Sequence, residues 1–444
     1  MTTSLDLPAA RRRYVTACAL FWLPAGLTTA PLILLFTERG MTMAAIAGFF
    51  AAHSLTAAAL ELPTGGLSDV LGRRAVLAAA GLLNLTALTL QALGTTAWVL
   101  TLGMVLMGTA RALSSGPAEA WYVETVHAHT GPDAELRTGL ARGGSATSAA
   151  LATGTLLGGA LPWLLGLGPD LGARLSGATS GLVLPLSVPL LLGAAVDIAF
   201  VLYVLAALCE PPRAKATLRG VLQGIPATVL GGLRLGARDA LVRRVFLSAG
   251  AVGCALAALE LLTPGRAAAL TGASESGAVL YAVIACLGFV SSGVGSHLAP
   301  LTARLAGSGQ RAVMVSLGAG ASGLLLLGAT AVSTAPFAVV LAGGYALVYL
   351  GIGAAAPSEN ELLHRRVPSA GRATALSVQS LALQLVGALS GLVVGVLPAG
   401  PLPWLLGGTA LLAGAVLWIQ RDPSTPSRTA NSTNSVQVVG ERAS

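Results

Sequence analysis

The chain is a succession of long apolar stretches separated by short polar connections. A helix that spans a bilayer needs about 20 consecutive, mostly apolar residues. Only 10% of the 444 residues are charged and 54% are hydrophobic, so a water-soluble fold could not cover its surface with polar groups. We therefore predict an all-α membrane protein with twelve transmembrane helices, at 14–36, 42–67, 75–93, 97–123, 138–166, 182–209, 244–270, 275–302, 311–332, 336–361, 371–398 and 402–420.

The basic residues divide unequally between the two sides of this predicted membrane protein. One side, with both termini, carries 22 of the 26 lysines and arginines. The other side carries Arg39, Arg174 and Arg266, and Arg111 lies inside a predicted span. Because cytoplasmic loops are enriched in Lys and Arg, this asymmetry predicts that both termini are cytoplasmic in a multi-pass plasma-membrane protein. The first apolar run resembles a signal peptide, but its length favours a spanning helix.

The predicted spans form two halves of six. Residues 1–209 would form the N-terminal bundle, 210–243 a cytoplasmic linker, 244–420 the C-terminal bundle and 421–444 a disordered cytoplasmic tail. The halves share a weak repeat: Gly72-Arg73-Arg74 corresponds to Gly309-Gln310-Arg311, and Pro117-Ala118-Glu119 to Pro357-Ser358-Glu359. Such repeats are typical of transporters built from two related bundles, with the substrate path between them.

The most specific motif is the stretch Gly65-Gly66-Leu67-Ser68-Asp69-Val70-Leu71-Gly72-Arg73-Arg74 between spans two and three. It resembles the signature loop of the major facilitator superfamily, Gly-x-Leu-Ala/Ser-Asp-Arg-x-Gly-Arg-Arg/Lys, with valine in place of the first basic residue. The resemblance, to bacterial drug-efflux members in particular, implies two six-helix bundles that rock in alternating access. It also implies a cytoplasmic latch formed by Gly65, Asp69, Gly72, Arg73 and Arg74. The alternative is an ordinary charged loop that only fixes topology.

Charged residues within the predicted spans are the candidates for the transport path. Arg111 resembles the fourth-helix arginine of the same family, and a membrane-embedded arginine must pair or face water. Asp197 and Glu260 lie near mid-span, where an uncompensated charge costs at least ~2.5 kcal/mol. We predict that Arg111, Glu119, Asp197 and Glu260 serve proton coupling or the transport path. For each residue, a structural ion pair or a hydrogen bond between helices is the alternative.

Several function classes lack their motifs. The chain has no phosphate-binding Gly-x-x-x-x-Gly-Lys-Ser/Thr loop, no histidine cluster and no paired cysteine spacing. The basic residues are scattered, which disfavours nucleic-acid binding. We therefore expect no enzyme activity, no cofactor and no metal.

The function that we expect is proton-coupled efflux of a small apolar drug or metabolite by a monomer. The alternative is symport or uniport of a small polar nutrient, and a membrane-embedded sensor or enzyme is a third class. Its expected partners are the small-molecule substrate, protons and the lipid bilayer. Substrate, direction and coupling ion stay open at this point.

Overall fold

A computed structural model describes residues 7–131, 134–209, 230–231, 234–331, 338–367 and 369–419. These residues are helical and contain no β-strand. The helices are α1 (Leu7–Thr29), α2 (Leu32–Glu38), α3 (Met43–Leu71), α4 (Arg73–Leu93), α5 (Ala97–Ser114), α6 (Pro117–Thr130), α7 (Arg137–Leu165), α8 (Leu171–Ala178), the short 3-10 helix η1 (Pro185–Ser187), α9 (Val188–Ala207), α11 (Ala240–Thr271), α12 (Ser274–Ala306), α13 (Gly309–Ala329), α14 (Ala338–Arg366), α15 (Ser369–Val396) and α16 (Pro401–Val416).

The helices agree closely with the predicted spans. Among the described residues, ten helical segments are long and apolar enough to cross a membrane. An eleventh span consists of α1 and α2, which meet at a 42° bend. Pro31 begins α2 at this bend, and a proline cannot donate the backbone hydrogen bond that a continuous helix needs. The twelfth predicted span corresponds to α16, an apolar helix of 16 residues, which is short for a crossing.

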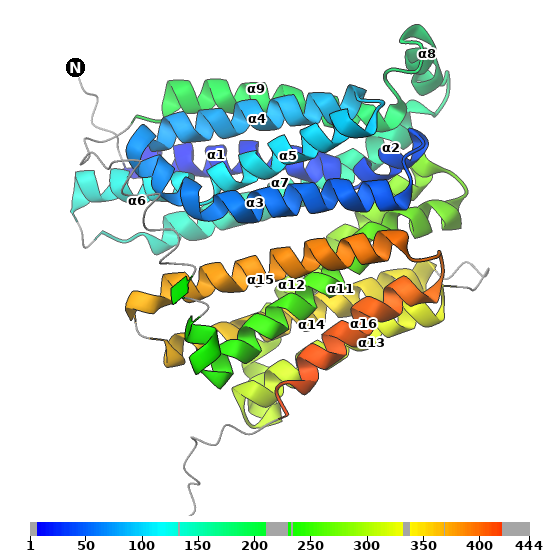
Figure 1. The fold of residues 1–444 in the computed structure, drawn as a ribbon. Helices are drawn as coiled ribbons and strands as arrows, with labels where there is room; N and C mark the ends of the chain where they lie inside the picture. Colours follow the sequence, from blue (N-terminus) through cyan, green and yellow to red (C-terminus); the bar gives the residue numbers. More distant parts are fainter. Residues whose placement is uncertain are drawn as a thin grey trace, which may run out of the picture.

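The helices gather into two bundles that lie one above the other in Figure 1. Helices α1 to α9 pack among themselves, and so do α11 to α16. The bundles meet mainly where α3 packs on α15 and α7 packs on α12. Residues 210–229 and 232–233 of the predicted linker lie outside the described residues, and so does the predicted tail 421–444.

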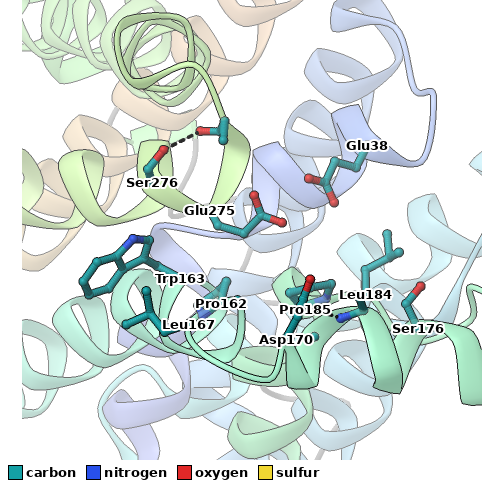
Figure 2. A pocket seen from close by; sticks show the side chains of 14 residues that line it. Glu38, Pro162, Trp163, Leu167, Asp170, Ser176, Leu184, Pro185, Glu275 and Ser276 are labelled. Atoms are coloured by element: carbon teal, nitrogen blue, oxygen red, sulfur yellow. Dashed lines mark hydrogen bonds between the residues drawn. The ribbon is translucent and has the colours of Figure 1, made fainter.

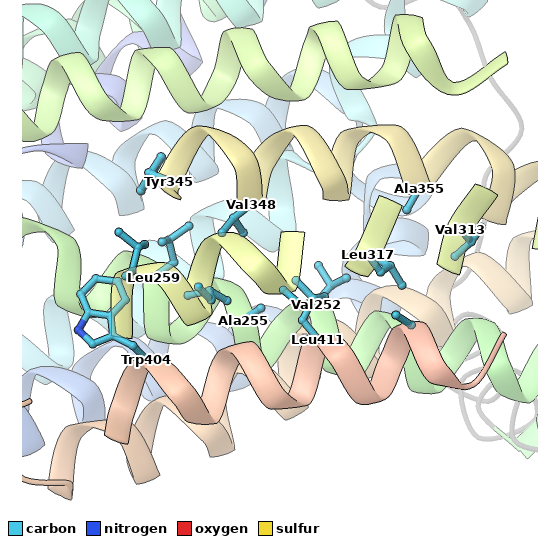
Figure 3. Close-up of a cluster of buried hydrophobic side chains, with 14 of the residues drawn as sticks. Val252, Ala255, Leu259, Val313, Leu317, Tyr345, Val348, Ala355, Trp404 and Leu411 are labelled. Carbon is cyan, nitrogen blue, oxygen red and sulfur yellow. The ribbon is translucent and has the colours of Figure 1, made fainter. Parts of the chain in front are cut away.

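The C-terminal bundle is organised around a continuous apolar core. Figure 3 shows Leu259, Val348, Trp404 and Leu411 converging from α11, α14 and α16. All four side chains are buried. In lipid, helices associate through close packing, so the packing of these buried side chains holds the bundle together as a unit.

A second apolar cluster joins the two bundles at the end of the molecule that is predicted to face outward. Its members come from both bundles; they include Leu35, Phe36 and Ile46 of the N-terminal bundle and Leu261 and Val394 of the C-terminal bundle. Close approach is possible because Gly159 of α7 faces α12: an added Cβ would lie 2.5 Å from the Ala278 carbonyl oxygen. The bundles are therefore in direct contact at this end.

Candidate functional site

A two-lobed cavity lies between the bundles. Its two adjoining spaces measure 340 and 280 Å³, which together suit a small ligand. Seven residues line both lobes and so form the boundary between them: Leu32, Ile33, Phe50, His53, Met107, Arg111 and Glu260. The cavity therefore lies at the interface between the bundles.

The smaller space, here called the aromatic lobe, is lined by rings from both bundles. They are Phe21, Trp22, Phe50, Tyr281, Phe289, Tyr345 and Tyr349. The rings of Tyr345 and Tyr349 stack with their centroids 5.0 Å apart. The larger space, the aliphatic lobe, is lined mostly by small and aliphatic residues such as Ala51, Gly253, Ala257 and Gly387.

Two opposite charges lie at the boundary between the lobes, one from each bundle. Arg111 belongs to the last turn of α5, and Glu260 lies near the middle of α11. Glu260 is deep in the molecule, yet its side chain is accessible because it lines the cavity. The Tyr349 hydroxyl donates a hydrogen bond of 3.1 Å to Glu260 Oε1. Within the described residues Arg111 has no carboxylate within 4.0 Å, so it interacts with Glu260 only at longer range.

Asp197 lies one layer behind the cavity, inside the N-terminal bundle. It is fully buried in α9 and accepts a 2.8 Å hydrogen bond from the Asn84 side-chain amide. Its other oxygen, Oδ1, has no hydrogen-bond partner among the described residues. Because Asn84 itself lines the aromatic lobe, Asp197 is connected to the cavity through one amide.

Two further acids lie away from the cavity. Glu119 is in the first turn of α6 and lines neither lobe. Glu359 is buried in α14 and accepts a hydrogen bond of 2.5 Å from the Ser248 hydroxyl within the C-terminal bundle. Of the four predicted residues, the structure thus brings Arg111 and Glu260 to one cavity, places Asp197 behind it and leaves Glu119 outside it.

The signature stretch is largely helical, where the sequence predicted a loop. Gly65 and Asp69 belong to α3, which continues to Leu71; their side-chain surroundings lie outside what the structure describes. Gly72 separates α3 from α4 with φ of 109°, a conformation that favours glycine. The turn is thus confined to a single residue.

The arginines that follow Gly72 contact their own bundle. Arg73 forms an ion pair of 2.8 Å with Glu124 of α6, and Arg74 donates to the Leu205 carbonyl of α9. In the C-terminal bundle Asp239 pairs with Arg366 at 2.5 Å. Burial of Asp239 disfavours its charge, but hydrogen bonds from Arg366 and from the amides at the start of α11 outweigh this and lower its pKa. Both ion pairs connect helices within one bundle.

A polar contact across the bundle interface was missed by the sequence analysis. Glu61 of α3 accepts a 2.8 Å hydrogen bond from Gln384 Nε2 and 3.3 Å hydrogen bonds from the Ser380 hydroxyl, both on α15. Gln384 also lines the aliphatic lobe. No local pattern marked Ser380 or Gln384, because the partners are more than 300 residues from Glu61.

A separate pocket of 570 Å³ lies at the predicted outer end, beside α8. Figure 2 shows Glu38 of α2 and Glu275 of α12 beside it, with Asp170 and Trp163 on the same pocket. No group of histidine, cysteine or acidic side chains within the described ranges has the geometry to hold a metal ion.

Comparison with solved structures identifies the fold. A mutant form of the nucleoside transporter NupG superposes with a TM-score of 0.72 at 15% identity, over 92% of this chain and 99% of that chain. A D-xylose-proton symporter gives 0.68 at 15% identity, over 92% and 97%. A bacterial homologue of the human lysosomal transporter Spinster, inward-facing and unoccupied, gives 0.65 at 16%, over 93% and 95%.

The chain has the major facilitator fold. The predicted arrangement of two helical bundles is thereby confirmed. No protein-family model matches the sequence, and no curated protein matches it. The two-lobed cavity lies where the two bundles of this fold face each other.

Proposed function

We propose that this protein is a secondary active transporter of the major facilitator superfamily, acting as a monomer in the plasma membrane. The observation that carries the proposal is the cavity between the bundles, with Arg111 contributed by one bundle and Glu260 by the other. Rocking of the bundles would move these charges relative to each other. Occupancy of the cavity and the conformation of the transporter would then be coupled.

Glu260 is the proposed proton-exchanging group, and Arg111 modulates it. A carboxyl can exchange protons with water only where water reaches it, and Glu260 is accessible from the cavity. Asp197 is the second candidate, because it is buried with one neutral partner and one unpartnered oxygen. Glu119 would act outside the cavity, in the charge network near the signature stretch.

Efflux by antiport is the proposed direction. If a cationic group of the substrate and the proton both bind Glu260, their binding is mutually exclusive, and this exchange is what an antiporter requires. The alternative is uptake of a small polar nutrient by symport or uniport. It is favoured by the names of two similar structures, a D-xylose-proton symporter and a proton-dependent oligopeptide transporter.

The test of coupling uses the purified protein in vesicles that contain a pH-sensitive dye. Ethidium, tryptophan or uridine is added, and proton movement is recorded for wild type, Glu260→Gln, Asp197→Asn and Arg111→Ala. We expect the wild type to move protons, Glu260→Gln to lose the response and Asp197→Asn to keep it. Glu361→Gln is the matched control, because Glu361 is exposed and already pairs with Arg365.

Two results would change this proposal. If no tested compound moves protons through the wild type, proton coupling of these compounds is wrong. If Asp197→Asn abolishes the response while Glu260→Gln retains it, Asp197 is the proton carrier.

The proposed topology has both termini and the signature stretch in the cytoplasm. Reporter fusions after Thr95 and at the C-terminal tail should therefore report opposite sides of the membrane. A tail on the outer side would rule out the twelve-span arrangement.

A further inference from the structure

The aromatic lobe concentrates rings far beyond their abundance in the chain. Aromatic residues make up 5% of the sequence, yet seven of the eighteen residues that line this lobe are aromatic. Tyr349 stacks on Tyr345 and meets Phe289 edge to face at 6.5 Å. Ring faces and edges that border open space favour a flat ring as ligand, through offset stacking and edge contacts.

Several polar side chains in the wall of the lobe bond to other parts of the protein. The hydroxyls of Thr28 and Thr29 both donate to the Ala25 carbonyl at 2.9 Å. The Asn84 amide donates to Asp197 and the Tyr349 hydroxyl to Glu260. Four polar side chains of the lobe are therefore already hydrogen-bonded within the protein.

The charges at the lobe boundary indicate which charges a ligand should carry. Arg111 and Glu260 are the arginine and the carboxylate that line both lobes, and within the described residues they form no contact within 4.0 Å. A ligand with one positive charge would pair with Glu260 and leave Arg111 uncompensated. A ligand with one negative charge would leave Glu260 uncompensated. Either remaining charge is costly away from bulk water, whereas a ligand with both charges satisfies both groups.

We propose that the substrate is a small aromatic zwitterion, with its ring in the aromatic lobe, its cationic group on Glu260 and its anionic group on Arg111. This inference rests on the proposed transport function and names the substrate class of the same cavity. The ring supplies the apolar contact, and the paired charges orient the ligand across the bundle interface. The ligand thereby bridges α5 of one bundle and α11 of the other.

The test is calorimetric titration of the detergent-purified full chain, without any ion gradient, with four probes. Tryptophan has the ring and both charges, tryptamine lacks the carboxylate, indole-3-propionate lacks the amine, and leucine lacks the ring. Because each other probe lacks one of the three contacts, tryptophan should bind ~10-fold or more tightly than each of them.

Variants assign each end of the ligand. Arg111→Gln should lower the affinity for tryptophan to that of tryptamine and leave tryptamine binding unchanged or tighter. Glu260→Gln should lower the affinity for tryptophan to that of indole-3-propionate and leave the binding of indole-3-propionate unchanged or tighter. Arg174→Gln removes the same charge from the exposed helix α8, away from both lobes, and should bind every probe as the wild type does.

The outcomes that overturn the proposal are distinct. Equal or tighter binding of tryptamine would make the ligand an organic cation, equal binding of leucine would remove the role of the rings, and binding of no probe would exclude the class. Because these titrations need no gradient, a failure here leaves proton movement by other compounds intact. Conversely, binding of tryptophan without any proton movement in vesicles would refute the coupling and keep the ligand class.

Discussion

The two bundles carry the same arginine at the same place. Arg39, after α2, donates to the carbonyls of Ala92 and Leu93 at the end of α4. Arg266, near the end of α11, donates to the carbonyls of Leu327 and Thr330 at the end of α13. In each bundle an arginine of the first span thus caps the last turn of the third, where a positive charge also interacts favourably with the helix dipole.

The charges that face the cavity have no such counterpart. By the spacing that relates Arg39 to Arg266, Glu260 corresponds to Ile33, which lines the same cavity. By the spacing that relates Pro117 to Pro357, Arg111 corresponds to Gly351. We infer that the shared arginines maintain architecture and that the charges present at the cavity in one bundle only are candidates for function. This contrast supports the roles proposed for Arg111 and Glu260.

Asp69 should give the largest effect, because it too is present in one half only. The position three residues before Gly72 is Asp69, whereas the position three residues before Gly309 is Ala306. Asp69→Asn removes the charge and nearly preserves the shape. We expect loss of transport with normal membrane insertion, from a weakening of closure by ~1 kcal/mol or more if the charge lies at a helix N-terminus.

The matched control for Asp69→Asn is again Glu361→Gln, which removes a charge from the predicted cytoplasmic end of the other bundle. Its transport rate should equal that of the wild type in the same vesicle assay. Normal transport by Asp69→Asn at normal expression would show that the signature stretch only fixes the topology. Asp69 would then no longer be a functional difference between the two halves.

Span positions were predictable because apolar runs and their interruptions are local properties. The short interval between the predicted spans 244–270 and 275–302 illustrates this: α11 ends at Thr271, Gly272 adopts φ of 80° and α12 begins at Ser274. The bend at Pro31 was missed because the apolar residues continue without interruption across it. Similarly, the signature stretch was predicted to be a loop, whereas α3 in fact continues to Leu71.

The partners of the charged residues were not predictable, because they depend on which helices become neighbours. Asn84 lies 113 residues from Asp197, and Tyr349 lies 89 residues from Glu260. The structure also explains why two basic residues, Arg39 and Arg266, lie on the predicted outer side. A count of charges could not show this. Their charges cap helices within the bundles, so they do not weigh against the predicted orientation.

The smallest expected effect belongs to the shared arginines and concerns stability. Arg39→Gln and Arg266→Gln each leave helix-terminal carbonyls without a charged donor, which should lower the free energy of unfolding by about 1–3 kcal/mol. Arg266 also lies over the Trp404 ring at 5.8 Å. Arg39 in turn donates to the Leu182 carbonyl and the Ser187 hydroxyl, so we expect losses of similar size in the two variants. Thermal unfolding in detergent measures both.

Transport distinguishes architecture from function in these two variants. Neither arginine lines a lobe of the cavity, so the transport rate per folded molecule should equal that of the wild type in both. Arg39→Lys and Arg266→Lys keep the positive charge with fewer donors and should recover part of the lost stability. A transport defect confined to one of the two glutamine variants would show that the arginines have different roles, and similarity of the two bundles would no longer mark a residue as architectural.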